Sequence, residues 1–360
     1  RDCNVMLDAR AGKLLQLDDR LAHEPQPTRL FLAFGDGSVG DQPILDRAGD
    51  KKTAARYRSK QAAYIKAINK HAWDGKWYKY GTKDSGEWIG SSRSPAGKIH
   101  LNAQTWSILT GIAPEDRAAA AWDSVKKHLL SPYGPLLLSP AYTIPDPTIG
   151  YITRYSPGSR ENGGVYMHAA TWALATACKR RDIESVARIW KSISPPTRGQ
   201  EADSYFAEPY VTPGNVDGPL SDKPGRAGWT WYTGSAAWLN RVSLEWILGI
   251  RPTWTGKGEA GLLIDPVVPA EFGEVEATRT WRGRKIRIRF DSRSFIASQP
   301  AQVTIAGSGS PIPGGILTES LLKNLSPGDV LDVQITWGAP RAADSGPSEA
   351  KPARSTAAVA

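Results

Sequence analysis

The period of the apolar residues changes once along the 360-residue chain, near Arg251, and this change separates two classes of structure. Before Arg251, apolar side chains recur at the spacing of one face of an α-helix. After Arg251, short apolar and β-branched runs are separated by turn residues, which is typical of strands. The sequence therefore predicts a helical domain over residues 46–255, followed by a small all-β element over residues 256–339.

The helical part contains six predicted helices, joined by connections of two lengths. The predicted ranges are 54–72, 101–109, 114–130, 163–179, 183–193 and 235–248. The long connections, 131–161 and 195–228, are rich in Gly, Pro and aromatic residues, and long loops inside compact domains are usually functional. We therefore expect a mainly α fold, a toroid of helical hairpins with its binding loops gathered at one end, and six helices would be half of a twelve-helix (α/α) barrel.

The remaining segments have weaker patterns. Strands of the β element are predicted at 262–264, 274–278, 284–290, 302–305 and 330–336. Residues 1–45 keep no apolar period and are predicted to be a degenerate N-terminal segment. Residues 340–360 are rich in Ala, Ser and Pro without an apolar face, so they are predicted to be a disordered tail.

Composition argues against several classes of protein. No apolar run approaches the ~20 residues of a membrane span, and no basic-then-apolar leader is visible at the start. Cys3 and Cys178 are the two cysteines and cannot form a disulfide framework, which favours a reducing cytoplasm. The net charge of +9 comes from scattered cations, so nucleic acid is not an expected partner. The sequence predicts a cytoplasmic protein that does not contact a membrane.

The chain contains 14 Trp residues, an unusual number. Flat indole faces suit the apolar faces of sugar rings, whereas packing in the core is the ordinary role of this residue. Core packing is expected for most of them, but the run Trp229-Thr230-Trp231-Tyr232 favours sugar binding. No metal-ligand spacing, GxxxxGK[ST] phosphate loop or GxSxG nucleophile elbow is present. No metal is expected, and sugar chemistry with carboxylates and an anion site remains.

Three segments hold the residues best suited to such chemistry. In segment 155–168, Arg160 and Glu161 precede a Gly-Gly pair, where a helix start is predicted whose backbone N–H groups favour anions. His168 falls within the first turns of that predicted helix. The alternative interpretation is a capped helix with a satisfied histidine.

The other two segments are loops rich in aromatic residues. In segment 205–218, Glu208 and Asp217 lie among aromatics, a setting that suits sugar hydroxyls, although a polar loop is the alternative. In segment 225–236, a Thr hydroxyl and flexible Gly backbone precede a helix, which again suits an anion, although an aromatic helix entry is the alternative.

In this order, the three segments resemble glycoside hydrolase family 94, which includes cellobiose, cellodextrin, laminaribiose, chitobiose and cellobionic acid phosphorylases and a module of cyclic β-1,2-glucan synthases. Further matching stretches are 69–78, 102–106, 245–250 and 264–266. The resemblance spans about residues 46–290. It implies an (α/α)6 barrel between a large β-sandwich domain and a small β element, of which this chain would hold the second half of the (α/α)6 barrel and the small all-β C-terminal element.

The resemblance also implies roles for individual residues. Phosphate would be held by His168 of the ENGG-x-x-x-H motif and by Thr233 and Gly234 of the WTWYTGSA motif. Arg160 and Glu161, at the opening of the ENGG motif, would line the acceptor-sugar side.

The family's general acid is an Asp in an Asp-Trp-Asn-Asp motif, which is not intact in this chain. Asp2, in Asp2-Cys3-Asn4-Val5, is the candidate for its remnant. The family's Gly-Arg-Gly-Glu-Ser run is also missing from residues 13–45.

The implied activity is inverting phosphorolysis of a β-linked disaccharide, of cellobiose or cellobionic acid type, to a sugar 1-phosphate and the released acceptor. Inorganic phosphate is then a co-substrate, no cofactor is expected, and the full-length protein is a possible homodimer. The loop 213–219 looks closer to the cellobionic acid or chitobiose branches, and Arg154 and Arg160 could pair with an acceptor carboxylate. Two alternatives stay open: a glucan-processing module of a cyclic β-1,2-glucan synthase, and an inactive fragment that binds sugar or phosphate.

Overall fold

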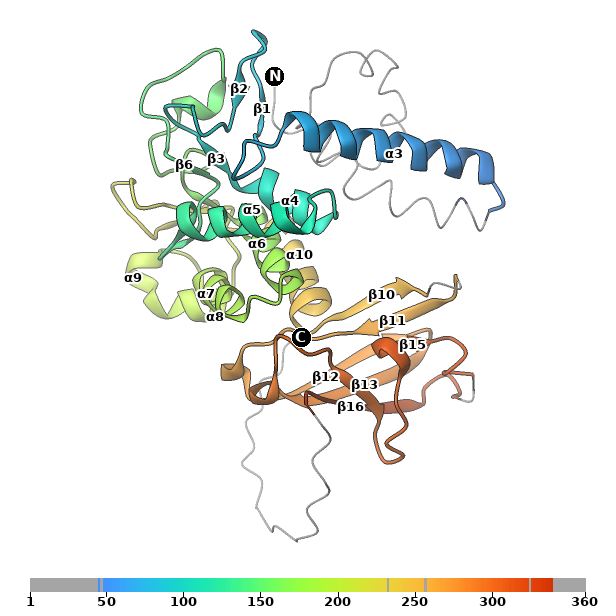
Figure 1. The fold of residues 1–360 in the computed structure, drawn as a ribbon. Coiled ribbons are helices and arrows are strands. Elements are labelled where there is room, and N and C mark those ends of the chain that lie inside the picture. The colour runs from blue at the N-terminus through green and yellow to red at the C-terminus, as the bar shows by residue number, and fades with distance from the viewer. Residues whose placement is uncertain (1–44, 46–47, 232, 256–257, 324, 339–360) are drawn as a thin grey trace.

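The computed structural model describes residue 45 and residues 48–231, 233–255, 258–323 and 325–338. Helices dominate up to residue 247, and sheets follow (Figure 1). The principal helices are α3 (Lys51–His71), α4 (Leu101–Leu109), α5 (Glu115–His128), α6 (Met167–Lys179), α7 (Ile183–Ile193) and α10 (Thr233–Val242), and two short helices are α8 (Pro195–Arg198) and α9 (Ala202–Tyr205). A π-helical turn, Ser243–Ile247, continues α10.

Local chemistry accounts for the helix ends. The α5 helix follows Pro114, has two acidic residues in its first turn and three basic residues in its last turn, so its charges complement the helix dipole. The α7 helix is capped by Asp182, whose side chain accepts a hydrogen bond from the Ser185 amide. The other carboxylate oxygen of Asp182 accepts a bond from the indole N–H of Trp122 at 2.9 Å, which ties α7 to α5.

The α6 helix lies at the centre of the helical part. Every residue from Met167 to Cys178 is buried, and α6 packs against α4, α7 and α10. Three indole rings, from Trp106, Trp172 and Trp238, meet edge to face with centroids 5.2–6.3 Å apart. We call these three residues the tryptophan cluster.

The C-terminal part consists of two sheets in which most neighbouring strands are antiparallel. One holds β10 (Ile250–Trp254), β11 (Ala260–Ile264) and β15 (Ile316–Thr318) in that order. The other holds β12 (Glu274–Trp281), β13 (Arg284–Asp291), β16 (Val330–Thr336) and β14 (Gln302–Ile305), with β13 and β16 parallel. The alternation along β13 buries Ile286, Ile288 and Phe290, and these side chains join the same apolar core as the helices.

The structure corrects some of the predicted bounds. The helix predicted from residue 163 begins at Met167, because Val165–Tyr166 form a strand, β7, that pairs with β8 (Asn215–Val216). The Gly-Gly pair is therefore not a helix start, and the predicted anion-favouring amides do not lie there. Strand β10 pairs with β11, so the C-terminal sheet begins before residue 256.

The helices do not close into a ring within the described residues, and α3 extends away from the others (Figure 1). No helix of this part of the chain combines the length and apolar character needed to cross a bilayer. The predicted N-terminal segment and tail fall almost entirely on residues 1–44 and 339–360, which lie outside the described residues.

Candidate functional site

A small three-stranded sheet brings the three chemically promising segments together. Strand β7 pairs with β8, and β8 pairs with β9 (Ala227–Gly228), so each segment supplies one strand. The amide of Gly214 also bonds the Gly228 and Trp229 carbonyls, at 3.1 and 2.9 Å, and the Met167 amide bonds the Gly214 carbonyl at 3.0 Å. This sheet therefore positions the starts of α6 and α10 beside one another.

Close backbone approach in this region depends on glycine. The Gly218 amide donates to the Gly158 carbonyl at 2.7 Å, and a Cβ atom at Gly218 would lie 2.3 Å from the Gly163 carbonyl oxygen. Any larger residue at 218 would push the 205–218 segment away from the ENGG motif.

The imidazole of His168 lies directly against Gly234. A Cβ atom at Gly234 would fall 2.5 Å from His168 Nε2, so only glycine allows the ring to reach the α10 backbone. His168 is the second residue of α6, is 5 % exposed, and its ring stacks on Tyr166 with centroids 5.5 Å apart. Burial lowers the pKa of His168, so the ring is neutral at pH 7 and carries one N–H donor.

The start of α10 is anchored to the same loop. The Ser235 hydroxyl donates to the Pro213 carbonyl at 3.0 Å. Thr233 begins α10, but its side chain lies outside the described part of the structure, as does Asp2 altogether. Of the predicted phosphate residues, the structure thus brings His168 and Gly234 together and places the Thr233 backbone at the adjacent helix start.

Arg160 and Glu161 lie at the turn before β7. The guanidinium of Arg160 lies over two aromatic rings, 4.7 Å from the Tyr155 centroid and 4.4 Å from the Trp229 centroid. Its Nε lies 3.7 Å from Glu161 Oε2. That oxygen is buried and accepts no hydrogen bond from the described residues.

Asn162 fixes the shape of this turn, and the sequence analysis did not assign it a role. Its side chain is fully buried, and Oδ1 accepts from the Tyr142 amide at 2.7 Å. Its Nδ2 donates to the Tyr142 and Tyr155 carbonyls, both at 2.8 Å. The only sequence signal for this role is an amide residue between a charged pair and two glycines.

Four exposed aromatic residues, Phe206, Tyr210, Trp229 and Trp231, form what we call the aromatic rim. Trp229 is 56 % and Trp231 63 % exposed. The Trp231 indole N–H donates to Glu208 Oε1 at 3.0 Å, and its ring meets Tyr210 edge to face at 5.9 Å. The second Glu208 oxygen is buried and has no hydrogen-bond donor among the described residues. Large exposed rings beside carboxylates suit sugar recognition.

Asp217, the other predicted carboxylate, has a different setting. Its Oδ2 accepts from the Ser221 hydroxyl at 2.8 Å, and its backbone bonds both Arg226 and Gly225. Burial raises the pKa of Asp217. These contacts hold the turn between β8 and β9.

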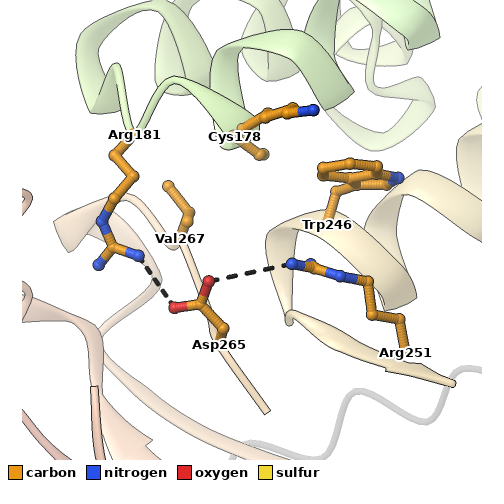
Figure 2. A pocket seen from close by; sticks show the side chains of 7 residues that line it. Cys178, Arg181, Trp246, Arg251, Asp265 and Val267 are labelled. Atoms are coloured by element: carbon orange, nitrogen blue, oxygen red, sulfur yellow. Dashed lines mark hydrogen bonds and ion pairs between the residues drawn. The ribbon is translucent and has the colours of Figure 1, made fainter. Parts of the chain in front are cut away.

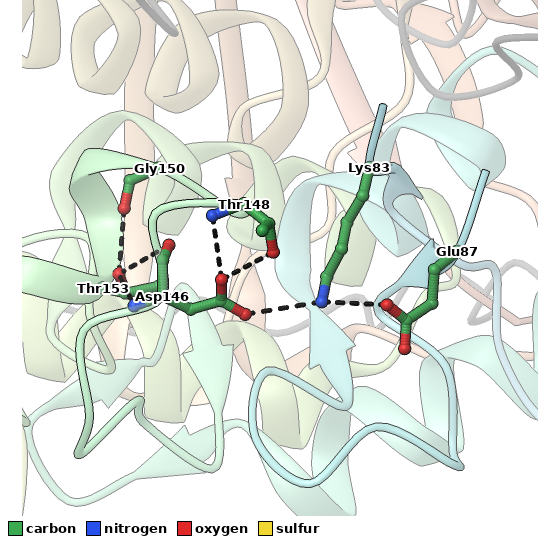
Figure 3. Close-up of polar contacts among 6 residues, drawn as sticks. All are labelled: Lys83, Glu87, Asp146, Thr148, Gly150 and Thr153. Atoms are coloured by element: carbon green, nitrogen blue, oxygen red, sulfur yellow. Dashed lines mark hydrogen bonds and ion pairs between the residues drawn. The ribbon is translucent and has the colours of Figure 1, made fainter. Parts of the chain in front are cut away.

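A polar network restrains the long loop that leads to Tyr155 (Figure 3). The ammonium of Lys83 lies 3.0 Å from Glu87 Oε2 and 3.4 Å from Asp146 Oδ2. The Asp146 amide donates to the Thr153 hydroxyl at 2.8 Å, and that hydroxyl donates to the Gly150 carbonyl at 2.9 Å. The network links the β1–β2 hairpin, Gly81–Thr82 and Trp88–Ile89, to the loop that holds Asp146 and Thr153.

The described residues contain no group of three or more His, Cys, Asp or Glu side chains placed to hold a metal ion. A cavity of about 240 Å³ lies where the helices meet the C-terminal sheets, and a second, of about 700 Å³, is lined by Arg181 and otherwise by residues 263–315 of the C-terminal part. None of the predicted site residues lines either cavity.

Comparison with known proteins supplies an independent finding. Residues 42–249 match the family model described as the glycosyl hydrolase 94 superfamily, catalytic domain. The chain is 30% identical over 76% of its length to N,N'-diacetylchitobiose phosphorylase of Vibrio proteolyticus, covering 34% of that protein. It is 33% identical over 71% of its length to solabiose phosphorylase of Paenibacillus borealis, covering 33% of that protein.

A third relative has a different activity. The chain is 35% identical over 70% of its length to cyclic beta-(1,2)-glucan synthase of Rhizobium meliloti, covering 9% of that protein. The chain spans about a third of the length of each of these two phosphorylases.

Proposed function

The chain belongs to the glycosyl hydrolase 94 superfamily, and from this premise we propose that it takes part in the phosphorolysis of a β-linked disaccharide. Phosphate attacks the anomeric carbon, the glycosidic bond breaks, and the acceptor sugar leaves with a proton from a general acid. The products are a sugar 1-phosphate of inverted configuration and the free acceptor. We further propose that the helices form part of an (α/α)6 barrel.

The contact between His168 and Gly234 is the observation that carries the proposal. The neutral imidazole offers an N–H donor to a phosphate oxygen, and the α10 amides that begin at Thr233 favour an anion. Both groups are held before phosphate arrives, because the β7–β8–β9 sheet fixes the starts of α6 and α10. Holding the nucleophile in place lowers the entropic part of the barrier.

Because phosphate is the nucleophile, the proposed reaction needs only one catalytic carboxylic acid, the general acid. An inverting hydrolase needs an acid for the leaving oxygen and a base to activate water, whereas phosphate is already an anionic nucleophile. Asp2 is the candidate acid in this chain, and it lies outside the described residues.

Arg160, Glu161 and the aromatic rim are proposed to hold the acceptor sugar. The Arg160 guanidinium is oriented by two aromatic rings and suits a carboxylate, while Glu161 Oε2 suits a hydroxyl. Because of this pairing of groups, we propose a disaccharide of the cellobionic acid type as the substrate, with an aldonic acid as the acceptor. A disaccharide of the cellobiose type is the second candidate substrate.

The test is to incubate the 360-residue chain with phosphate and, separately, cellobiose, cellobionic acid and diacetylchitobiose, and to follow sugar 1-phosphate by ³¹P NMR. We expect a phosphate-dependent product with at least one disaccharide, and no product from a His168→Asn variant. Release of free sugars at a rate independent of phosphate would reject phosphorolysis.

The relative with cyclic glucan synthase activity favours one alternative, a glucan-processing module. The same assay with a β-1,2-glucan in place of the disaccharides separates the two, because only the module would shorten or transfer the glucan. A chain that binds phosphate at the His168 site but turns over no sugar would instead be a binding fragment.

A further inference from the structure

A cavity of about 240 Å³ lies at the junction between the helical part and the C-terminal sheets (Figure 2). Its walls come from the end of α6, the π-helical turn after α10, strand β10 and the segment that follows β11. We call it the junction cavity. It is smaller than the ~300–1,000 Å³ of pockets for drug-sized ligands, so it suits a small ligand.

Cations outnumber carboxylates around the junction cavity. Lys179, Arg181 and Arg251 line it together with one acidic residue, Asp265. Asp265 Oδ1 lies 2.9 Å from Arg181 Nη1, whereas its Oδ2 lies 4.0 Å from Arg251 Nη2. The carboxylate of Asp265 is therefore paired mainly with Arg181, and the charge of Arg251 is less fully compensated.

The three cations differ in how many donors remain for a ligand. Arg181 uses its other nitrogens on the carbonyls of Ala297 and Gln299, so it serves as a structural link. Arg251 donates one bond, to the Glu245 carbonyl, and its guanidinium lies 4.9 Å from the Trp246 ring centroid. Lys179 donates to the Leu109 carbonyl at 2.9 Å, and an ammonium has three donors.

The pKa directions of the two cations follow mainly from burial. Burial lowers the pKa of Arg251, and burial followed by the charge of Arg251 lowers the pKa of Lys179. Both groups would therefore gain from an anion in the cavity, because an opposite charge within a few ångströms favours the charged form of each.

We propose that the junction cavity binds a phosphoryl group, either inorganic phosphate or the phosphate of a small sugar ester, with Lys179 and Arg251 as its cationic ligands. Such a ligand joins α6 to β10 and stiffens the contact between the helical part and the C-terminal sheets. The site is separate from the one built on His168 and Gly234, and it does not depend on the proposed phosphorolysis.

The test is calorimetric titration of inorganic phosphate into the full chain carrying His168→Asn, which removes the imidazole from the other proposed phosphate site. Sodium chloride holds the ionic strength constant. We expect one phosphate site to remain. Lys179→Met on this background should weaken it roughly tenfold, the effect of losing a charged hydrogen bond. Lys179→Arg should keep the affinity within about threefold.

Lys191→Met is the matched control, because Lys191 is an exposed lysine in the last turn of α7 and does not line the cavity. It should leave the affinity unchanged. Equal affinities for the Lys179→Met and Lys191→Met variants would overturn the proposal, as would the absence of any phosphate binding on the His168→Asn background. A parallel titration with glucose 1-phosphate identifies the source, since tighter binding of the ester than of inorganic phosphate assigns the site to the ester.

Discussion

The tryptophan cluster and the aromatic rim use the same kind of side chain in opposite ways. Trp106 and Trp172 are buried on helices, with their rings packed against each other. Trp229 and Trp231 are mostly exposed and lie on a loop where both residues have positive φ, 57° and 64°. Left-handed backbone costs non-glycine residues energy and concentrates at functional sites. The comparison teaches that burial, not residue type, separates a tryptophan that stabilises the fold from one that is available to a ligand.

The largest expected difference between the two regions is in stability. Trp172→Ala should lower the free energy of unfolding by about 3–5 kcal/mol, because it leaves a cavity between α4, α6 and α10. Trp229→Ala should lower it by less than ~1 kcal/mol, because most of that ring is already in water. Urea denaturation of both variants checks this. Similar losses would mean that the rim is part of the core.

The second prediction concerns a buried histidine of the helical core. The ring of His100 stacks on Tyr80 at 4.2 Å, and burial lowers the pKa of His100 to about 3. Between this pKa and the higher pKa of the unfolded chain, His100 is therefore protonated in the unfolded chain but neutral in the folded chain. Stability is complete above the unfolded pKa of ~6.5 and is lost as the pH falls toward 3, by about 2 kcal/mol between pH 8 and pH 5.

Denaturation across this pH range should show a smaller loss for His100→Gln than for the unmodified chain. His71→Gln, at the exposed end of α3, should leave the loss unchanged. His168 adds a loss of the same sign, because burial lowers its pKa as well. An identical pH dependence in the His100→Gln variant would show that the ring is not a buried neutral group.

The same contrast explains how far the sequence could predict the molecule. The bounds of α4, α7, β14 and β16 were predicted to the residue, because each rests on a local period and nearby terminating residues. Strand β7 was missed and α6 was predicted to begin too early, because Val165 and Tyr166 form a strand only through pairing with residues about fifty positions later. Long-range pairing leaves no local period in the sequence.

The residues of the candidate site also fall into two groups, those that the sequence identified and those that only the structure reveals. His168, Gly234, Arg160 and Glu161 were identified through motif resemblance, and the structure then supplied the contact between the first two. Asn162 had no such signal, because its role depends on where the Tyr142 backbone lies. The junction cavity likewise needs side chains from the end of α6 and from β10, which no local pattern connects.

The third prediction tests whether the contact between His168 and Gly234 forms an anion site. Gly234→Ala should weaken phosphate binding at least tenfold in a chain that carries Lys179→Met, because its methyl group displaces His168 Nε2. The overpacking cost of about 1–3 kcal/mol is partly offset by the helix propensity of Ala, so the net loss of stability should stay below ~2 kcal/mol. Phosphate titration and urea denaturation measure the two effects.

Ala236→Gly is the control, because it changes helix propensity on the same turn at an exposed position. It should leave the affinity for phosphate unchanged. If Gly234→Ala bound phosphate as well as the control did, the imidazole would not be a phosphate ligand.

The smallest expected effect comes from the rim itself. Trp231→Phe keeps an aromatic face but removes the indole N–H that donates to Glu208 Oε1 at 3.0 Å. Because Trp231 is 63 % exposed, water replaces the lost donor, and the free energy of unfolding should fall by less than ~1 kcal/mol. Without the indole donor, Glu208 Oε1 is able to accept a hydrogen bond from a sugar hydroxyl. The affinity for the disaccharide should therefore change, while the affinity for phosphate should not. Unfolding curves and separate titrations with cellobiose and phosphate distinguish these effects, and a stability loss as large as that of Trp172→Ala would erase the distinction between cluster and rim.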